Sequence, residues 1–162
     1  MAAVSGKVDQ KTVMADIDIT QAEADALIAM EKGCTEEKRW LFPAPGDRIA
    51  IPLTSRDKRE NFMLDIARVR IKLTKATYQN RARAAIILMR LDLDGGPHRN
   101  PDGEEIPCPH LHIYREGFGD KWAIPAPVER YTNTSDLSST LDSFMQHCNI
   151  TERPNIQIGL FS

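Results

Sequence analysis

The sequence lacks any apolar run long enough to cross a membrane. Its longest apolar run, from about Ala84 to Met89, is far shorter than the roughly 20 residues that a membrane-spanning helix needs. The N-terminus also lacks the basic region and following apolar stretch of a secretory signal. Together these absences predict a cytoplasmic protein with no membrane partner.

Cysteine is scarce, and its positions give no sign of a disulfide framework. Cys34, Cys108 and Cys148 lie far apart and form no Cys-x-x-Cys pair. An odd count without an export signal favours reduced thiols. Each cysteine is most simply a small buried side chain.

Repeats, linkers and low-complexity segments are absent as well. A chain of 162 residues most simply forms one domain. We expect residues 1–18 to form a flexible N-terminal tail and residues 19–162 to form a single α+β domain.

Helices are predicted near both ends of this domain. The capping box Thr20-Gln-Ala-Glu23 begins the first, and Gly33 is placed to end it. A second helix is predicted over residues 135–148, capped by Thr134 or Ser135. Between the helices, strands are predicted from alternating or apolar segments (residues 48–53, 61–66, 69–74, 84–93, 109–114 and 121–124).

The most regular alternation lies in residues 69–74, where Val69, Ile71 and Leu73 share one face of the predicted strand. The order of a helix, a run of strands and a helix predicts an α+β fold. We expect a mainly antiparallel sheet with an N-terminal and a C-terminal helix packed on it.

Charge is distributed unevenly along the chain. Residues Thr54 to Arg90 contain ten basic and three acidic side chains, a charge of +7, which leaves −9 on the remainder of a chain with net charge −2. A local positive field attracts phosphate groups. The alternative interpretation is that these side chains are solvated or paired with acids elsewhere. Under the first interpretation RNA is the partner, and the residues expected to bind it are Lys72, Lys75, Tyr78, Arg81 and Arg83.

Three of the four histidines fall within 15 residues: His98, His110 and His112. In a strand, His110, His112 and Tyr114 project from one face while the residues between them face the core. Residues two apart on a strand are separated by about 6.5 Å, so both imidazoles can converge on one small group. His98 reaches the same region if its neighbouring strand pairs with this one.

Two kinds of chemistry suit such a histidine cluster. Imidazole titrates near neutral pH, so one ring can serve as general base and another as general acid. RNA supplies its own nucleophile in the 2′-hydroxyl, and cleavage then needs no metal or other cofactor. The catalytic residues expected for this reaction are His98, His110, His112 and Tyr114.

The alternative chemistry is a metal centre. His98, His110 and His112, with Cys108 as a replacement for one of them, can bind zinc or another divalent metal and leave one position open for water. Asp92 and Asp94 alternate with apolar residues on the preceding strand and can orient an imidazole or bind a metal, but they are more simply salt-bridge partners of the neighbouring basic segment. A purely structural role, with the histidines hydrogen-bonded in a polar cleft or at a protein interface, remains a third interpretation.

The segment from His98 to Gly117, HRNPDGEEIPCPHLHIYREG, resembles the signature of a family of small, uncharacterised bacterial and prophage proteins. The similarity extends from about Ile71 to Ile150, and the family implies no activity. The run Pro-His-Leu-His-Ile followed by Lys-Trp-Ala is more loosely similar to the histidine-bearing strand of toxins from toxin–antitoxin modules. That second resemblance implies ribonuclease activity.

The sequence therefore leads to three functional hypotheses. The first is a toxin-like, metal-independent endoribonuclease whose partners are RNA and a cognate antitoxin. The second is a non-enzymatic binding protein, encoded by a phage or prophage, that inhibits a host or defence factor. The third is a metal hydrolase with histidine ligands.

Overall fold

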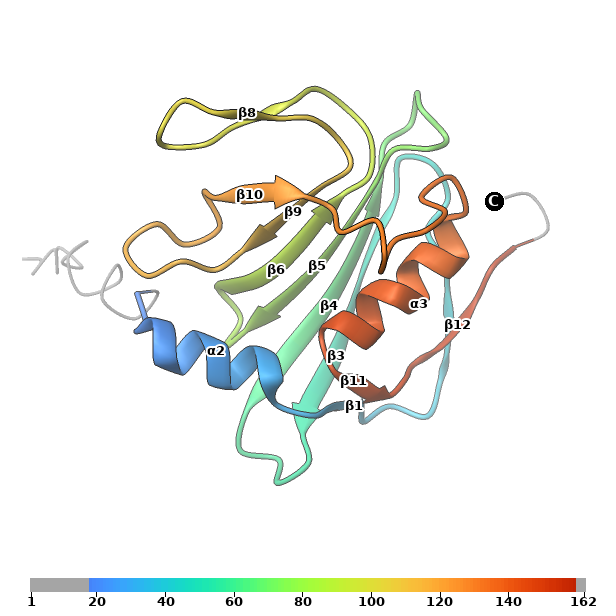
Figure 1. Cartoon of the computed structure of the whole chain (residues 1–162). Helices are drawn as coiled ribbons and strands as arrows, with labels where there is room; N and C mark the ends of the chain where they lie inside the picture. The colour runs from blue at the N-terminus through green and yellow to red at the C-terminus, as the bar shows by residue number, and fades with distance from the viewer. Residues whose placement is uncertain (1–17, 160–162) are drawn as a thin grey trace, which may run out of the picture.

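The computed structural model describes residues 18–159, and these residues form a mostly β structure. Of the described residues 14% are helical and 39% lie in strands, and the main sheet is a curled, mixed sheet of eight strands that resembles half of a barrel (Figure 1). The predicted α+β class is therefore wrong. Both expected helices exist, but they are short and strands dominate the fold. The predicted flexible tail lies outside the described residues, apart from Asp18.

The elements follow one another along the chain in an order dominated by strands. Their bounds are α2 Gln21–Ala29, β1 Lys32–Cys34, β2 Arg39–Leu41, β3 Arg48–Ser55, β4 Asn61–Arg68, β5 Ala76–Ala82, β6 Ile86–Asp92, β7 His98–Arg99, β8 Glu105–Ile106, β9 His110–Ile113, β10 Ala123–Pro125, α3 Leu137–His147, β11 Ile150–Glu152 and β12 Asn155–Gln157.

The eight-stranded sheet has the order β10-β9-β6-β5-β4-β3-β1-β11. Its centre, β3 to β6, is a series of antiparallel hairpins between consecutive strands. At one edge β1 and β11 pair in parallel, which makes the sheet mixed. The remaining named strands form two small sheets, β2 with β12 and β7 with β8.

Strand alternation gives the main sheet one apolar and one polar face. On β5, Tyr78 is fully buried and its ring lies 6.0 Å from that of Phe144 on α3. Both helices pack on this side (Figure 1), which we call the helix-covered face. Thr77 and Gln79 project from the opposite face because neighbouring residues of a strand point to opposite sides. That opposite, polar face carries the candidate site.

The predicted strand over residues 69–74 is absent. These residues form the turn between β4 and β5, where the side chain of Ile71 is 96% exposed and that of Leu73 is 66% exposed. The turn is held by Arg68, whose guanidinium donates to the carbonyl oxygens of Pro43 and Leu73. The strand lies instead at Ala76–Ala82. Several of its core-facing residues are small or polar, so the sequence there shows no regular alternation of apolar and polar residues.

The C-terminal ends of both helices are hydrogen-bonded to the buried side chain of Lys32. Its Nζ donates to the carbonyl oxygens of Ile28 and Met30 at the end of α2, at 2.9 and 2.8 Å. It also donates to Cys148 at the end of α3, at 2.7 Å. Carbonyl groups at helix ends lack partners within the helix, so this single ammonium group satisfies both ends. Burial lowers the pKa of Lys32 to about 8.

The two helix starts are capped by side chains. The Thr20 hydroxyl accepts from the backbone N–H of Glu23 at 3.1 Å, as the capping box predicts. The second helix is capped by Asp136 instead of Thr134 or Ser135. Gly33 does not end the first helix but lies in β1, where a Cβ atom would come within 2.9 Å of Glu152. No helix in residues 18–159 is long and apolar enough to cross a membrane.

Candidate functional site

The candidate site lies on the polar face, where β6 pairs with β9. Their antiparallel register places His110 opposite Asp92 and His112 opposite Arg90. The intervening Leu111 faces the core and is fully buried. Alternation on both strands therefore brings two imidazoles, one carboxylate and one guanidinium to the same place.

Asp92 is the shared partner of the two imidazoles. The Oδ2 atom of Asp92 lies 3.2 Å from His110 Nε2 and 3.3 Å from His112 Nε2. The hydroxyl of Thr77, on the neighbouring strand β5, donates to Asp92 Oδ1 at 2.9 Å. Burial alone would raise the pKa of Asp92. The hydrogen bond with His112, the charge of Arg90 and the hydrogen bond from Thr77 outweigh burial and hold that pKa well below its usual range. The carboxylate is therefore ionised.

The other nitrogen of each imidazole also faces a protein atom. His112 Nδ1 donates to the backbone carbonyl oxygen of Asp120 at 2.7 Å, which fixes the orientation of a fully buried ring. His110 Nδ1 lies 3.5 Å from the Sγ atom of Cys108, and this ring is also buried. Burial is the main cause that lowers the pKa of His110, so this imidazole is neutral near pH 7.

Arg90 supplies the positive charge of the site. Its Nη2 lies 3.0 Å from His112 Nε2, and its Nε lies 3.3 Å from Asp92 Oδ2. Its Nη1 pairs with the carboxylate of Asp120. The guanidinium thus occupies the point toward which the imidazole and the carboxylate converge.

His98 joins the cluster from the β7–β8 segment. Its ring centre lies 4.5 Å from that of His112 and 5.8 Å from that of His110. His98 Nε2 donates to the carbonyl oxygen of Lys121 at 2.7 Å. The structure thus brings together all three histidines of the predicted cluster.

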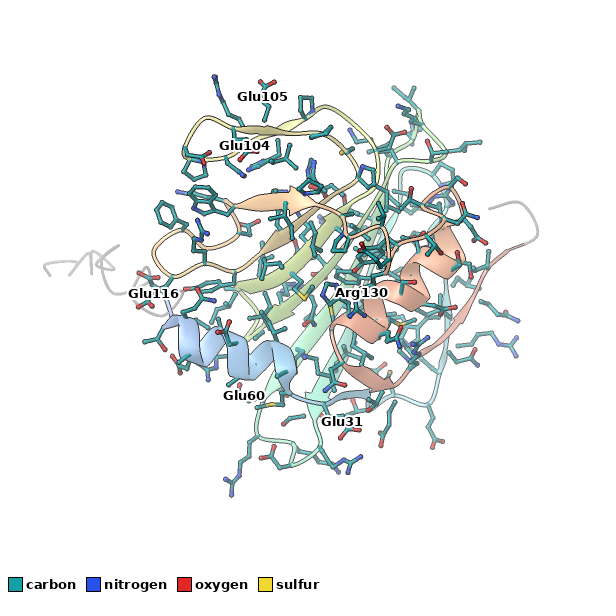
Figure 2. All side chains as sticks on the ribbon, in the orientation of Figure 1. Glu31, Glu60, Glu104, Glu105, Glu116 and Arg130 are labelled. Carbon is teal, nitrogen blue, oxygen red and sulfur yellow. The ribbon has the colours of Figure 1, made fainter. Side chains whose placement is uncertain are left out.

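The β7–β8 segment is fastened against β10 by Asn100. The amide of Asn100 donates to the carbonyl oxygen of Ala123 at 2.9 Å and accepts from the N–H of Ala123 at 2.8 Å. Figure 2 shows Glu105 pointing outward from the outer arm of this segment, and the side chains of both Glu104 and Glu105 are exposed. The segment therefore holds His98 in place and keeps its acidic side chains outside the site.

Tyr114 lies apart from this cluster. Its ring belongs to the hydrophobic core, and its hydroxyl accepts from the N–H of Ile19 at 3.0 Å and donates to the carbonyl oxygen of Ile19 at 2.8 Å. Strand β9 ends at Ile113, so the alternation expected from the sequence does not extend to Tyr114. Its hydroxyl ties the start of α2 to the end of β9.

The predicted RNA-binding residues are mostly engaged within the protein. Lys72 pairs with Asp94, Arg81 with Asp65 and Arg83 with Glu60. The ring of Tyr78 is buried and its hydroxyl donates to the carbonyl oxygen of Leu137. Lys75 makes no ion pair with any residue in the described part of the chain. Lys72, Arg81 and Arg83 are therefore paired with acids, although Asp65 and Glu60 are already counted in the charge of +7.

Cys108 contacts the cluster without being activated by it. Burial is the main cause that raises the pKa of its thiol, and the charges of Asp92 and Asp94 raise it further. A protonated thiol is a poor nucleophile and a poor metal ligand. Cys108 therefore contacts His110 Nδ1 but is not expected to bind a metal ion. The third group that converges with the imidazoles is Asp92.

Asp92, His110 and His112 form a potential metal-binding group. One donor atom from each residue lies within 4.8 Å of the others. Two histidines and one carboxylate are a common ligand set for divalent transition metals. The sequence placed Asp92 on a strand near the histidines, but only the register of β6 against β9 identifies it as their common partner.

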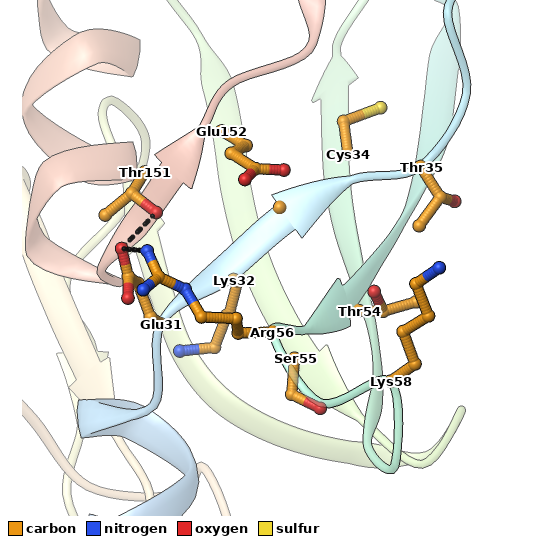
Figure 3. Close-up of a pocket in the computed structure, with 11 residues that line it drawn as sticks. Glu31, Lys32, Cys34, Thr35, Thr54, Ser55, Arg56, Lys58, Thr151 and Glu152 are labelled. Atoms are coloured by element: carbon orange, nitrogen blue, oxygen red, sulfur yellow. Dashed lines mark hydrogen bonds and ion pairs between the residues drawn. The ribbon is translucent and has the colours of Figure 1, made fainter.

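Another hollow, of about 320 Å³, lies beside β1 and has no comparable cluster. Figure 3 shows Glu31 at this hollow, bonded to Arg56 and Thr151. Lys32 lines it as well, but its ammonium group is used by the helix ends described above. The polar groups here stabilise the edge of the sheet.

Comparison with known proteins assigns the chain to one family. Residues 19–150 match a family of unknown function, DUF6978, and the chain belongs to this family. No curated protein and no solved structure matches the chain.

Proposed function

We propose that the protein is a hydrolase that binds a divalent metal ion through Asp92, His110 and His112. The observation that carries the proposal is the spacing of three donor atoms: Asp92 Oδ2 lies 3.2 and 3.3 Å from the two imidazole Nε2 atoms. Two ligands of a four-coordinate ion, each bound at about 2.0 Å, are separated by about 3.3 Å. The distance from the carboxylate to each imidazole is thus already that expected around a zinc-like ion, and all three donor atoms lie within 4.8 Å of one another.

The groups behind these donors support the same proposal. A histidine that binds a metal usually donates its second ring N–H to a carbonyl or carboxylate oxygen, and His112 Nδ1 donates to Asp120 in this way. The Thr77 hydroxyl similarly fixes the carboxylate of Asp92. Such contacts hold the donors in place before an ion enters.

The same geometry argues against direct acid–base catalysis by His110 and His112. Both Nε2 atoms face Asp92, and both Nδ1 atoms face Cys108 or Asp120. Neither ring therefore has a free nitrogen with which to reach a substrate. A metal ion held by the Nε2 atoms would instead offer an open coordination position to water or substrate.

The expected chemistry is activation of water. A divalent ion held by three protein ligands keeps a position for water and lowers the pKa of that water toward neutrality. Arg90 must leave His112 Nε2 to admit the ion, and its ion pair with Asp120 gives it a place at the rim. From there the guanidinium can donate to an anionic substrate. His98 stays bound to Lys121 and keeps its ring against His112.

Metal content tests this proposal directly. Purified protein equilibrated with zinc and then desalted should retain about one equivalent, measured by elemental analysis. Asp92→Asn and His110→Gln should each retain less than about a tenth of an equivalent, because ligand loss removes a third of the donors. His147→Gln is the matched control, since it removes a histidine far from the site. Equal zinc in the wild type and the Asp92→Asn variant would contradict the proposal.

A metal-independent endoribonuclease is the second candidate. It is favoured by Arg90, whose guanidinium fills the centre of the cluster in place of a metal ion. His98, bound through Nε2 alone, would then be the proton-transferring residue. In this case RNA is cleaved in the presence of EDTA and His98→Ala abolishes cleavage. A toxin with a cognate antitoxin belongs to this candidate, and growth arrest that depends on His98 would support it.

A non-enzymatic inhibitor of a host or defence factor is the third candidate. It is favoured by the nearly complete exposure of Ile71 on the turn between β4 and β5. A stoichiometric protein partner that is lost in Ile71→Ser would support it. A cytoplasmic location, suggested by three free cysteines, and a phage or prophage origin are part of this proposal.

A further inference from the structure

We infer that a recess on the polar face, next to Asp92, binds the phosphate groups of single-stranded RNA. The inference rests on the proposed hydrolase function and gives it a substrate class. The recess lies over β3, β4 and β5 and has a volume of about 550 Å³. Its polar lining comes from Arg48, Asp65, Thr77, Gln79 and Arg81.

Strand register connects the recess to the metal-binding group without interruption. One row of paired residues runs from Ala67 through Thr77 and Asp92 to His110. Thr77 belongs to both places, because it lines the recess and donates to Asp92. A ligand in the recess therefore lies directly beside the carboxylate of the site.

A second row runs parallel to the first. It leads from Asp65 through Gln79 and Arg90 to His112. Neighbouring strands are about 4.8 Å apart, so β4 and β9 are separated by about 14 Å across the face. A ligand that reaches from the recess to the imidazoles must be extended, as a single-stranded polymer is.

The donors inside the recess are held in fixed positions. Asp65 accepts from Arg81 Nε and Nη2, at 2.7 and 3.1 Å, and from the Gln79 amide at 3.0 Å. The carboxylate balances the charge of Arg81. The opposite wall contributes Arg48, which is exposed and makes no ion pair with a described residue. The recess therefore has a net positive charge.

Further cations lie at the end of the strands nearest Arg48 and Asp92. The side chain of Arg70 packs beside Gly46, and the ammonium group of Lys75 lies beside Gly95. Like Arg48, neither forms an ion pair within residues 18–159. Separate cations along one edge suit a chain of phosphates better than a single carboxylate, because each phosphate can meet one cation.

RNA binding in EDTA tests the inference without requiring activity. The probe is a 5′-fluorescein-labelled single-stranded RNA of random sequence, followed by anisotropy over a range of salt concentrations. Arg48→Gln with Arg70→Gln should raise Kd at least tenfold. The slope of log K against log salt should fall by about 1.4, since each phosphate contact to a single strand contributes about 0.7.

Arg56→Gln is the matched control. It removes one exposed arginine beside Glu31, at the hollow near β1, and should leave Kd within twofold. Equal weakening by Arg56→Gln, or equal binding of labelled polyglutamate, would overturn the inference, and so would the absence of RNA binding at low salt. The outcome is separable from the metal proposal, since Asp92→Asn should lose zinc but keep RNA binding in EDTA.

Discussion

Asp92 and His110 lie opposite one another on β6 and β9, with the carboxylate Oδ2 3.2 Å from the imidazole Nε2. His112 approaches the same oxygen from the next position on that face. One carboxylate oxygen thus organises two buried rings, and the surrounding contacts decide how firmly it does so.

Thr77→Val should weaken metal binding without unfolding the protein. The change removes the hydroxyl that donates to Asp92 Oδ1 at 2.9 Å and keeps the shape of the side chain. Loss of such a supporting contact typically costs 10–100-fold in metal affinity, so we expect Kd for zinc to rise about tenfold. Competition with a chromophoric chelator measures it. Thr74→Val removes a similar bond to Asp94 and should leave zinc affinity unchanged, whereas an equal effect would contradict the assignment.

Tyr114→Phe should lower stability and leave the site intact. The hydroxyl exchanges two hydrogen bonds with the backbone of Ile19. Its removal leaves those groups without partners, which costs about 1–3 kcal/mol. Urea unfolding monitored by circular dichroism gives the change in free energy. Zinc content and any catalytic rate should stay within twofold of the wild type, and a large loss of rate at unchanged stability would restore a catalytic role for Tyr114.

Lys32→Met should be among the most destabilising single changes. The substitution keeps the length of the side chain but leaves three carbonyl oxygens at the ends of α2 and α3 without their shared donor. We expect the free energy of unfolding to fall by about 3 kcal/mol or more. Lys58→Met, at an exposed lysine, is the control in the same urea titration. Equal midpoints for the two variants would show that the ammonium group is not needed there.

His147 should make the protein less stable in mild acid. Burial is the main cause that lowers the pKa of His147 to about 4, with the charge of Arg130 adding to it. Between the ordinary pKa of about 6.5 and this lower value, the unfolded chain binds more protons than the native protein. The free energy of unfolding therefore falls as pH falls through this window.

His147→Gln should reduce this acid sensitivity. Glutamine has no proton to gain in this range, and its carbonyl can accept from the Tyr131 hydroxyl that lies 2.9 Å from His147 Nδ1. Thermal or urea unfolding at intervals from pH 7 to pH 4 compares the two proteins. The stability curve of the variant should be flatter, and curves of identical slope would refute the assignment.

Local patterns in the sequence are sufficient for most of the longer elements, although not for β5. The capping box at Thr20 and the apolar periods of β3, β4, β6 and β9 each specify their own structure through neighbouring residues. The short strands β1, β2, β11 and β12 have three residues each and too few positions for a period. Their pairing depends on partners far along the chain, so local patterns miss these strands and predict an α+β class in place of a mostly β one.

The candidate site likewise contains residues that local patterns predict and residues that only long-range strand pairing brings together. Alternation placed His110 and His112 on one face because that rule is local. Asp92 and His110 are 18 positions apart, and only the pairing of β6 with β9 brings them together. Conversely, the alternation of Val69, Ile71 and Leu73 is misleading, because these residues lie in the turn between β4 and β5, where no strand pairs with them and Ile71 and Leu73 are exposed.

The parallel pairing of β1 with β11 has a consequence for the order of folding during synthesis. The hairpins from β3 to β6 join neighbouring segments, so they can form as soon as those residues leave the ribosome. Lys32, by contrast, pairs with Ile150 and must wait for nearly the whole chain. Before that point the Lys32 ammonium group can already donate to the carbonyl groups at the end of α2, but α3, whose end it also binds, has not yet formed. The edge of the sheet is therefore the last part to close, and a ribosome stalled before residue 150 should carry a chain with an ordered centre and an open edge.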